Sequence, residues 1–226
     1  MKTLVLFFVC AAVGMVEAQS EPPSPAVPSR DYFPAGVFDT NTANSSAMWY
    51  GRTLAALEEP SLFAMNEKTI QVYRFLWLPS FHRPISVRLT VNADGSGSVI
   101  TKSVDKHMGL LLTKDTDEKL ADSGKLIIDT TTEASREQIQ NLVEQLQSLG
   151  FWSLPTEEPD EKEPDSKVIP GAHMVRVPPV DGARWILEGL RNGEYHVTDR
   201  WSPKNNSYSQ LCKYLLKLGQ VEVDLY

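Results

Sequence analysis

The sequence has little cysteine, no cluster of positive charge and, beyond its first residues, no long apolar run. Its 226 residues include two cysteines, and 29 acidic residues outweigh 22 basic ones to give a net charge of −7. Nucleic-acid binding is disfavoured, because it depends on Lys and Arg gathered against phosphates. After the first residues are removed, Cys212 alone cannot form an internal disulfide, so the hydrophobic core must stabilise the fold.

The chain also lacks the short motifs that would indicate a particular reaction. Gly-x-Ser-x-Gly, His-Glu-x-x-His and paired Cys-x-x-Cys are all absent. The histidines have no partner at metal-ligand spacing, and they are His82, His107, His173 and His196. We therefore expect neither a metal nor a cofactor.

The N-terminus has the pattern of a cleavable signal peptide over residues 1–18. Lys2 supplies a positive charge, residues 3–16 are apolar, and the small residues Val16 and Ala18 precede a cleavage point before Gln19. The alternative, a permanent anchor, is disfavoured because a spanning helix needs about 20 apolar residues. The sequence predicts an exported protein, periplasmic or secreted, with no membrane span after cleavage.

The mature chain divides into a leader and one domain. Residues 19–44 are rich in proline and are predicted to be a flexible leader. Residues 45–226 are predicted to form a single α+β domain that begins with a short helix near 46–57. Residues 155–167 are acidic and rich in proline. A solvated loop is favoured there over a cation site, because the spacing lacks the alternating ligands of a calcium loop.

Alternating apolar residues predict the first strands. Residues 70–78 place Tyr73, Phe75 and Trp77 on one side. Residues 85–104 form a hairpin whose turn, 92–97, is rich in residues that tolerate positive φ. Further strands are predicted at 124–131 and 174–177.

Two amphipathic helices are predicted, one after each group of strands. Ser135 begins the first, with Gln138 at the capping-box position and Gly150 at its end. One stripe of that helix is apolar and contains Ile139, Leu142, Val143, Leu146 and Leu149. Ser207 begins the second, which ends at Gly219. Both helices have an apolar side that can cover a sheet.

A second hairpin, residues 183–201, is predicted from its Asn192-Gly193 turn. Counting back from this turn pairs Glu188 with Val197 and Trp185 with Arg200. Hairpins imply an antiparallel sheet, so the predicted fold class is α+β, with two amphipathic helices packed on one face. The other face of the sheet is then left open.

Several sequence blocks resemble exported bacterial proteins of unknown function. The blocks are Tyr73-Arg74-Phe75-Leu76-Trp77-Leu78, Asp181-Gly182-Ala183-Arg184-Trp185 and Gly193-Glu194-Tyr195-His196-Val197-Thr198-Asp199-Arg200-Trp201-Ser202-Pro203. The resemblance covers most of residues 47–220 and implies a bacterial envelope or extracellular setting. It carries over no catalytic residue, because the role of those proteins is unassigned.

The second hairpin also gathers polar residues that could carry chemistry. The catalytic candidates are Glu188, Tyr195, His196 and Asp199. The binding candidates are Trp185, Arg200, Trp201, Arg74 and Arg88. The structural alternative, a cross-strand stack of Trp185 on Arg200 and an ion pair of Asp199 with a nearby arginine, is favoured over a functional role.

Two functions from different classes remain. The leading hypothesis is a non-catalytic exported module that binds a protein, a peptide or an envelope component through an exposed sheet face or edge. The alternative is a small hydrolase or lyase that uses the four catalytic candidates. An enzyme would bring those four side chains together in a concave pocket, whereas a binding module would have a shallow apolar patch.

Overall fold

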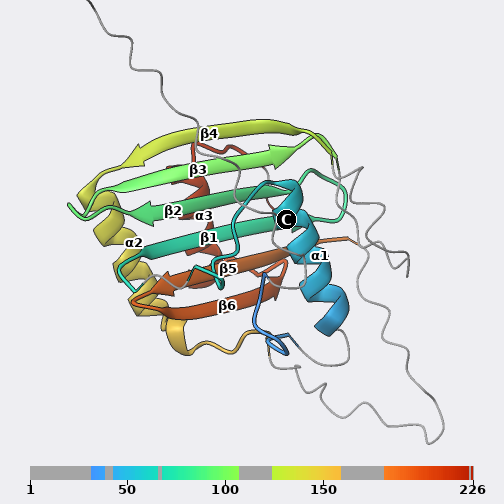
Figure 1. Ribbon diagram of the computed structural model, residues 1–226, viewed down its shortest axis with the longest axis horizontal. Coiled ribbons are helices and arrows are strands. Elements are labelled where there is room, and N and C mark those ends of the chain that lie inside the picture. Colours follow the sequence, from blue (N-terminus) through green and yellow to red (C-terminus); the bar gives the residue numbers. More distant parts are fainter. Residues whose placement is uncertain are drawn as a thin grey trace, which may run out of the picture.

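A six-stranded antiparallel sheet organises the residues that the structure, a computed structural model, describes: 32–38, 43–65, 68–106, 124–158, 181–223 and 225. The strands are β1 (Gln71–Pro79), β2 (Ile85–Val91), β3 (Gly97–Val104), β4 (Leu126–Ala134), β5 (Ala183–Arg191) and β6 (Glu194–Trp201). Their order in space is β4-β3-β2-β1-β5-β6 (Figure 1). The predicted α+β class and the antiparallel sheet are confirmed.

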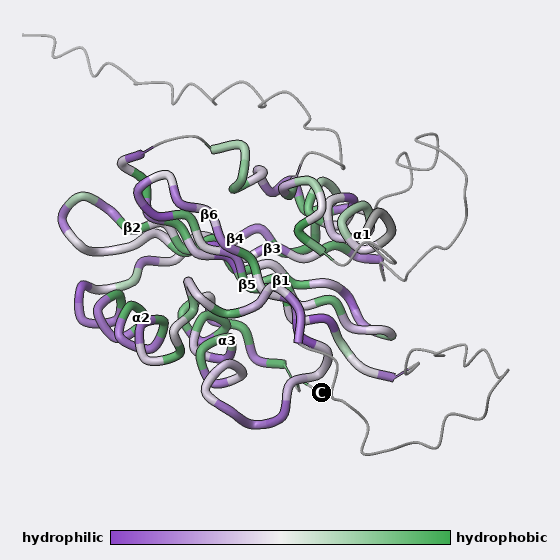
Figure 2. The backbone as a smooth tube through the Cα atoms, turned by 90° about the horizontal axis from the view of Figure 1, so that it is seen from below, coloured by the Kyte–Doolittle hydropathy of each residue, from purple (hydrophilic) through white to green (hydrophobic). Residues whose placement is uncertain are grey.

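Helices lie on both faces of this sheet. They are α1 (Ala43–Ala56), α2 (Arg136–Leu149), the short 3₁₀ helix η3 (Phe151–Ser153) and α3 (Ser207–Leu218). Helices α2 and α3 cover one face together, as predicted, whereas α1 covers the other (Figure 2). We call these the α2/α3 face and the α1 face.

Helix α2 forms where the sequence predicted it, for the predicted reasons. The Ser135 side chain accepts a hydrogen bond from the backbone N–H of Gln138, and the Gln138 side chain accepts one from the backbone N–H of Ser135. Gly150 ends the helix at φ 67°, a left-handed conformation that favours glycine. Helix α3 has an equivalent capping box between Asn206 and Ser209.

The main hydrophobic core fills the α2/α3 face. The alternate residues of β1 that the sequence assigned to one side, Tyr73, Phe75 and Trp77, are all buried there. The apolar stripe of α2 packs onto the same core, with Ile139, Leu142 and Leu146 buried and Val143 and Leu149 partly buried. Helix α3 completes it with a row of leucines and the buried thiol of Cys212.

The α1 face, which the sequence left open, is covered over β1, β5 and β6. Tyr50 and Leu54 of α1 are fully buried against Leu76 and Ile186 of the sheet. Residues 32–38, which lie within the predicted flexible leader, join this second core through Tyr32, Phe33 and Phe38. Coverage ends within β4, where Leu126 packs against the second core but Asp129, Thr131 and Glu133 are exposed.

The predicted register of the second hairpin is confirmed. Glu188 pairs with Val197 and Trp185 with Arg200 across β5 and β6. The outer edge of β6 is covered by the first residues of the predicted acidic loop, because the backbone N–H of Asp199 donates to Thr156 O at 2.6 Å. The signal peptide (1–18), the strand at 174–177 and most of the acidic loop (159–167) lie outside the described residues.

Candidate functional site

Glu188 and Tyr195, two of the catalytic candidates, meet in a buried charge network on the α1 face. Arg74 of β1 forms a forked pair with Glu188 of β5, in which Nε donates to Oε2 at 2.7 Å and Nη2 to Oε1 at 2.8 Å. Tyr195 of β6 donates its hydroxyl to Glu188 Oε1 at 2.8 Å. The side chains of Arg74 and Glu188 are wholly excluded from solvent.

Glu59, just after α1, is a member of this network that sequence reasoning missed. Its Oε2 accepts from Arg88 Nε at 2.8 Å and lies 3.4 Å from Arg74 Nη1. Arg74 Nη1 also donates to Pro60 O at 2.6 Å. The sequence presented Glu59 only as part of a helix-stop signal, and nothing local in that segment distinguishes a buried carboxylate from an exposed one. The network holds the loop after α1 against the sheet.

Burial sets the electrostatics of this network. Loss of solvent raises the pKa of Glu188, and the adjacent Arg74 guanidinium opposes that rise. Burial and the charge of Glu188 raise the pKa of Tyr195 well above its usual value, so its hydroxyl stays protonated and acts as a donor. The Glu188 carboxylate already accepts hydrogen bonds from Arg74 and Tyr195. These three side chains are therefore suited to holding β1, β5 and β6 together.

Asp199, the third catalytic candidate, lies on the same face but has separate partners. Its Oδ2 accepts from the Tyr50 hydroxyl at 2.6 Å and lies 3.4 Å from Arg184 Nη1. Burial raises the pKa of Asp199, and the Arg184 charge opposes the shift. The predicted ion pair of Asp199 with a nearby arginine is thus present, and Tyr50 ties α1 to β6.

His196, the fourth catalytic candidate, faces the opposite side of the sheet. Its ring lies edge-on against Phe151 with 5.0 Å between centroids, and Trp152 lies alongside. Burial lowers the pKa of His196. The sheet therefore separates His196 from Glu188, Tyr195 and Asp199, and the four side chains do not share a pocket.

The binding candidates are mostly interior residues. Trp185 is buried on the α2/α3 face beside Phe75, at 5.3 Å between ring centroids. Arg200 is also buried and lies over the ring of Tyr208, so the expected stack of Trp185 on Arg200 is wrong. Arg200 Nη2 donates a hydrogen bond to Pro155 O and Arg200 Nη1 donates one to Thr156 O, each at 2.8 Å.

The remaining binding candidates differ in exposure. Arg74 is enclosed and Arg88 is held by Glu59, as the buried network requires. Trp201, at the end of β6, is half-buried, with the Arg184 guanidinium 5.2 Å from its ring centroid. A partner of the folded protein could reach Trp201 but not Trp185 or Arg74.

Exposed apolar side chains instead gather at a shallow groove that the sequence did not indicate. The groove has a volume of about 750 Å³ and lies where the β1–β2 loop, the end of β3, the start of β4 and the C-terminal segment meet. Phe81, Ile127 and Val223 line it and are 58%, 45% and 37% exposed. The one available signal was a short apolar run, Leu126-Ile127-Ile128, at the start of a strand whose next residues are polar.

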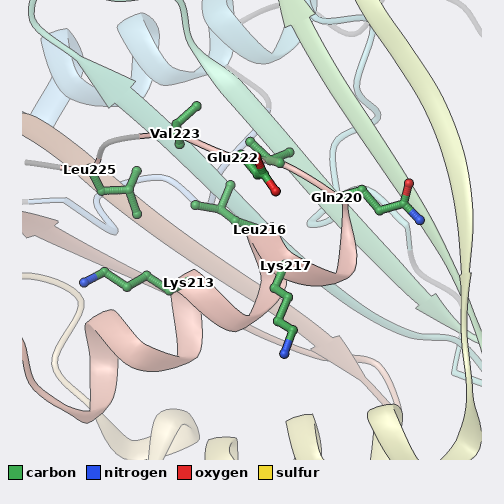
Figure 3. Close-up of a pocket in the computed structure, with 8 residues that line it drawn as sticks. Lys213, Leu216, Lys217, Gln220, Glu222, Val223 and Leu225 are labelled. Carbon is green, nitrogen blue, oxygen red and sulfur yellow. The ribbon is translucent and has the colours of Figure 1, made fainter.

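A second hollow adjoins the first along the C-terminal segment. Val223 and Leu225 of that segment lie across from Leu216 and Lys213 of α3 (Figure 3). Val223 lines both hollows, so the C-terminal segment forms the wall between them. The lining of this second hollow is mixed, because Lys213, Lys217, Gln220 and Glu222 lie beside its apolar residues.

Two features can be looked for directly in the parts of the chain that the structure describes: a group of metal-ligating side chains and a membrane-spanning helix. There, His, Cys, Asp and Glu form no group of three or more that could hold a metal ion. No helix within the same residues combines the length and the apolar character that a membrane crossing requires. No protein-family model matches the chain, and a comparison with curated proteins finds no significant match.

Proposed function

We propose that this chain is an exported, non-catalytic module that binds a protein or an envelope component through the groove lined by Phe81, Ile127 and Val223. The observation that carries the proposal is the grouping of these exposed side chains at one end of the sheet. Contiguous exposed apolar surface on a globular domain is typical of an interaction site. Single exposed apolar residues elsewhere, such as Met48, need no such explanation.

The separation of the catalytic candidates favours binding over turnover. A general acid or base must come within hydrogen-bonding distance of its substrate. Glu188 is enclosed by Arg74 and Tyr195, and His196 lies on the other face of the sheet. The hydrolase or lyase alternative therefore has no shared pocket in which to place a substrate.

The N-terminal sequence supports the export of this protein. The apolar run of residues 3–16 and the small residues before Gln19 support cleavage and release into the periplasm or medium. Protein recovered from the extracytoplasmic fraction should begin at Gln19. Recovery only from the cytoplasm, with Met1 retained, would exclude export.

The binding proposal can be tested by site-specific photo-crosslinking in producing cells. A photoreactive residue in place of Phe81 should give a discrete adduct with another protein or an envelope polymer. The same residue at Met48, which is 38% exposed on α1, is the matched control and should give none. Adducts of equal yield at both positions, or at neither, would refute the groove as the binding surface.

A further inference from the structure

The outer edge of β4, beside the groove, has the features of a site for strand addition. No described segment pairs with this edge, whereas the opposite edge of the sheet, on β6, is covered by Thr156 and Glu157. Strand β4 is nine residues long, and it contains neither lysine nor proline. Those residues commonly protect an edge strand from pairing with other chains, so their absence leaves the backbone of β4 competent to pair.

The register identifies which backbone groups point outward. In an antiparallel sheet, successive residues direct their N–H and C=O to opposite neighbours. The backbone N–H of Asn92 donates to Ser96 O at 2.8 Å, so Ser96 directs its backbone groups toward β2. By the same alternation, the next residue of β3, Gly97, directs its N–H and C=O toward β4. Gly97 therefore faces Ala134 of β4, and alternation along β4 leaves the outward groups on three residues: Asp129, Thr131 and Glu133.

The side chains of these outward residues define the charge that a partner should carry. Asp129 and Glu133 lie on the same face, four residues apart, and neither has an ion-pair partner among the described residues. Lys102 is opposite Asp129 on β3, but its ammonium group donates to Glu58 O at 2.9 Å. An added strand with basic residues at the matching positions would neutralise both carboxylates.

The same charges disfavour a second copy of this chain as the occupant. An antiparallel pairing of β4 with β4 that overlaps all three outward residues would place Asp129 of each copy opposite Glu133 of the other. Like charges directly opposite one another destabilise a strand pair. The acidic edge therefore favours a basic peptide over self-association.

We propose, on the basis of the binding function above, that the partner is an extended segment that adds as a seventh, antiparallel strand to β4. Its two basic residues, four apart, lie opposite Glu133 and Asp129. The residue after the second basic one points to the other face, on which Ile128 borders the groove. An apolar side chain there enters the groove beside Phe81. The recognised pattern is thus basic-x-x-x-basic-apolar.

A fluorescent nine-residue peptide of threonine and serine, with Lys at positions 2 and 6 and Phe at position 7, tests the pairing. It should bind the full mature protein in an anisotropy titration. N-methylation of position 4, opposite Thr131, should weaken binding roughly tenfold because it removes a hydrogen bond to β4. N-methylation of position 3, whose N–H points away, is the matched control and should have little effect. Equal effects at both positions, or no binding, would overturn strand addition.

Charge reversal tests the specificity. Asp129→Lys with Glu133→Lys should weaken binding of the lysine peptide roughly tenfold and favour a peptide with Glu at positions 2 and 6. Glu137→Lys with Glu144→Lys, on the exposed side of α2, changes the net charge equally and should not. Equal losses in both double variants would overturn the edge site. Crosslinking at Phe81 without any peptide binding would leave the binding module intact and refute strand addition alone.

Discussion

Removing one charge from the buried network on the α1 face should be far more costly than removing two. Glu188→Leu leaves the guanidinium of Arg74, which is wholly buried, with only Glu59 at 3.4 Å and Pro60 O as partners. Breaking a buried ion pair from one side costs about 3–5 kcal/mol. At 2–4 °C per kcal/mol for a domain of roughly this size, the melting temperature should fall by about 6–20 °C.

The double variant, Arg74→Met with Glu188→Leu, should recover at least about 2 kcal/mol of that loss. It removes the uncompensated charge, while Glu59 keeps its pair with Arg88. Guanidinium unfolding at constant pH, followed by tryptophan fluorescence, measures the free energies of unfolding of the wild type, Glu188→Leu and the double variant. Glu194→Leu breaks a rim pair with Arg191 at 3.8 Å and should cost at most about 1 kcal/mol. A double variant no more stable than Glu188→Leu alone would refute the reasoning.

Two further predictions concern helix α2 and the α2/α3 face. Ser135→Ala removes one half of the capping box and should lower the free energy of unfolding by about 1 kcal/mol, an effect that an unchanged denaturation midpoint would contradict. Burial lowers the pKa of His196, so its stabilising contribution is present above the unfolded-state pKa, near 6.5, and is lost as pH falls through that range. His196→Phe, which keeps an aromatic ring against Phe151, should therefore flatten the pH dependence of stability between about pH 7 and 5, and a profile identical to wild type would exclude this role.

Local patterns predicted those parts of the fold that local chemistry determines. The capping box at Ser135 and Gln138 forms as read from the sequence, because both of its hydrogen bonds span only three residues. The Asn192-Gly193 turn fixes the register of β5 and β6 for the same reason, since each pair is counted outward from the turn. Hairpins and amphipathic stripes together were sufficient to predict the α+β class.

The coverage of the α1 face could not be predicted, because its contacts are distant in sequence and mix charge with apolar residues. Arg74 and Glu188 are 114 residues apart, and Tyr50 and Asp199 are 149 apart. Both sides of β1 and β5 are buried, so alternation of polar and apolar residues could not identify a solvent side. A strand that contains Arg74 looks half-exposed until its buried partner is known.

The groove was missed for a different reason, since it is assembled from segments with no shared signal. Phe81 follows β1, Ile127 lies near the start of β4, and Val223 is near the end of the chain. Phe81 and Val223 each lie between polar neighbours, and Ile127 belongs to the short apolar start of β4, Leu126-Ile127-Ile128. Both patterns are ordinary on a protein surface. Only the fold brings them together, at the end of the sheet.

Asp129 and Glu133 provide a way to keep two copies of this chain from pairing along the edge of β4, with which no described segment pairs. A long, uncovered edge invites pairing between copies, and chains commonly prevent this with proline, lysine or a covering segment. Here the protection can come from Asp129 and Glu133, because overlap of two such edges opposes carboxylate with carboxylate. The same pair of charges admits a basic strand. Exclusion of self and recognition of a partner would then depend on the same two side chains, so reversing their charge would redirect the edge to acidic peptides without making it self-complementary.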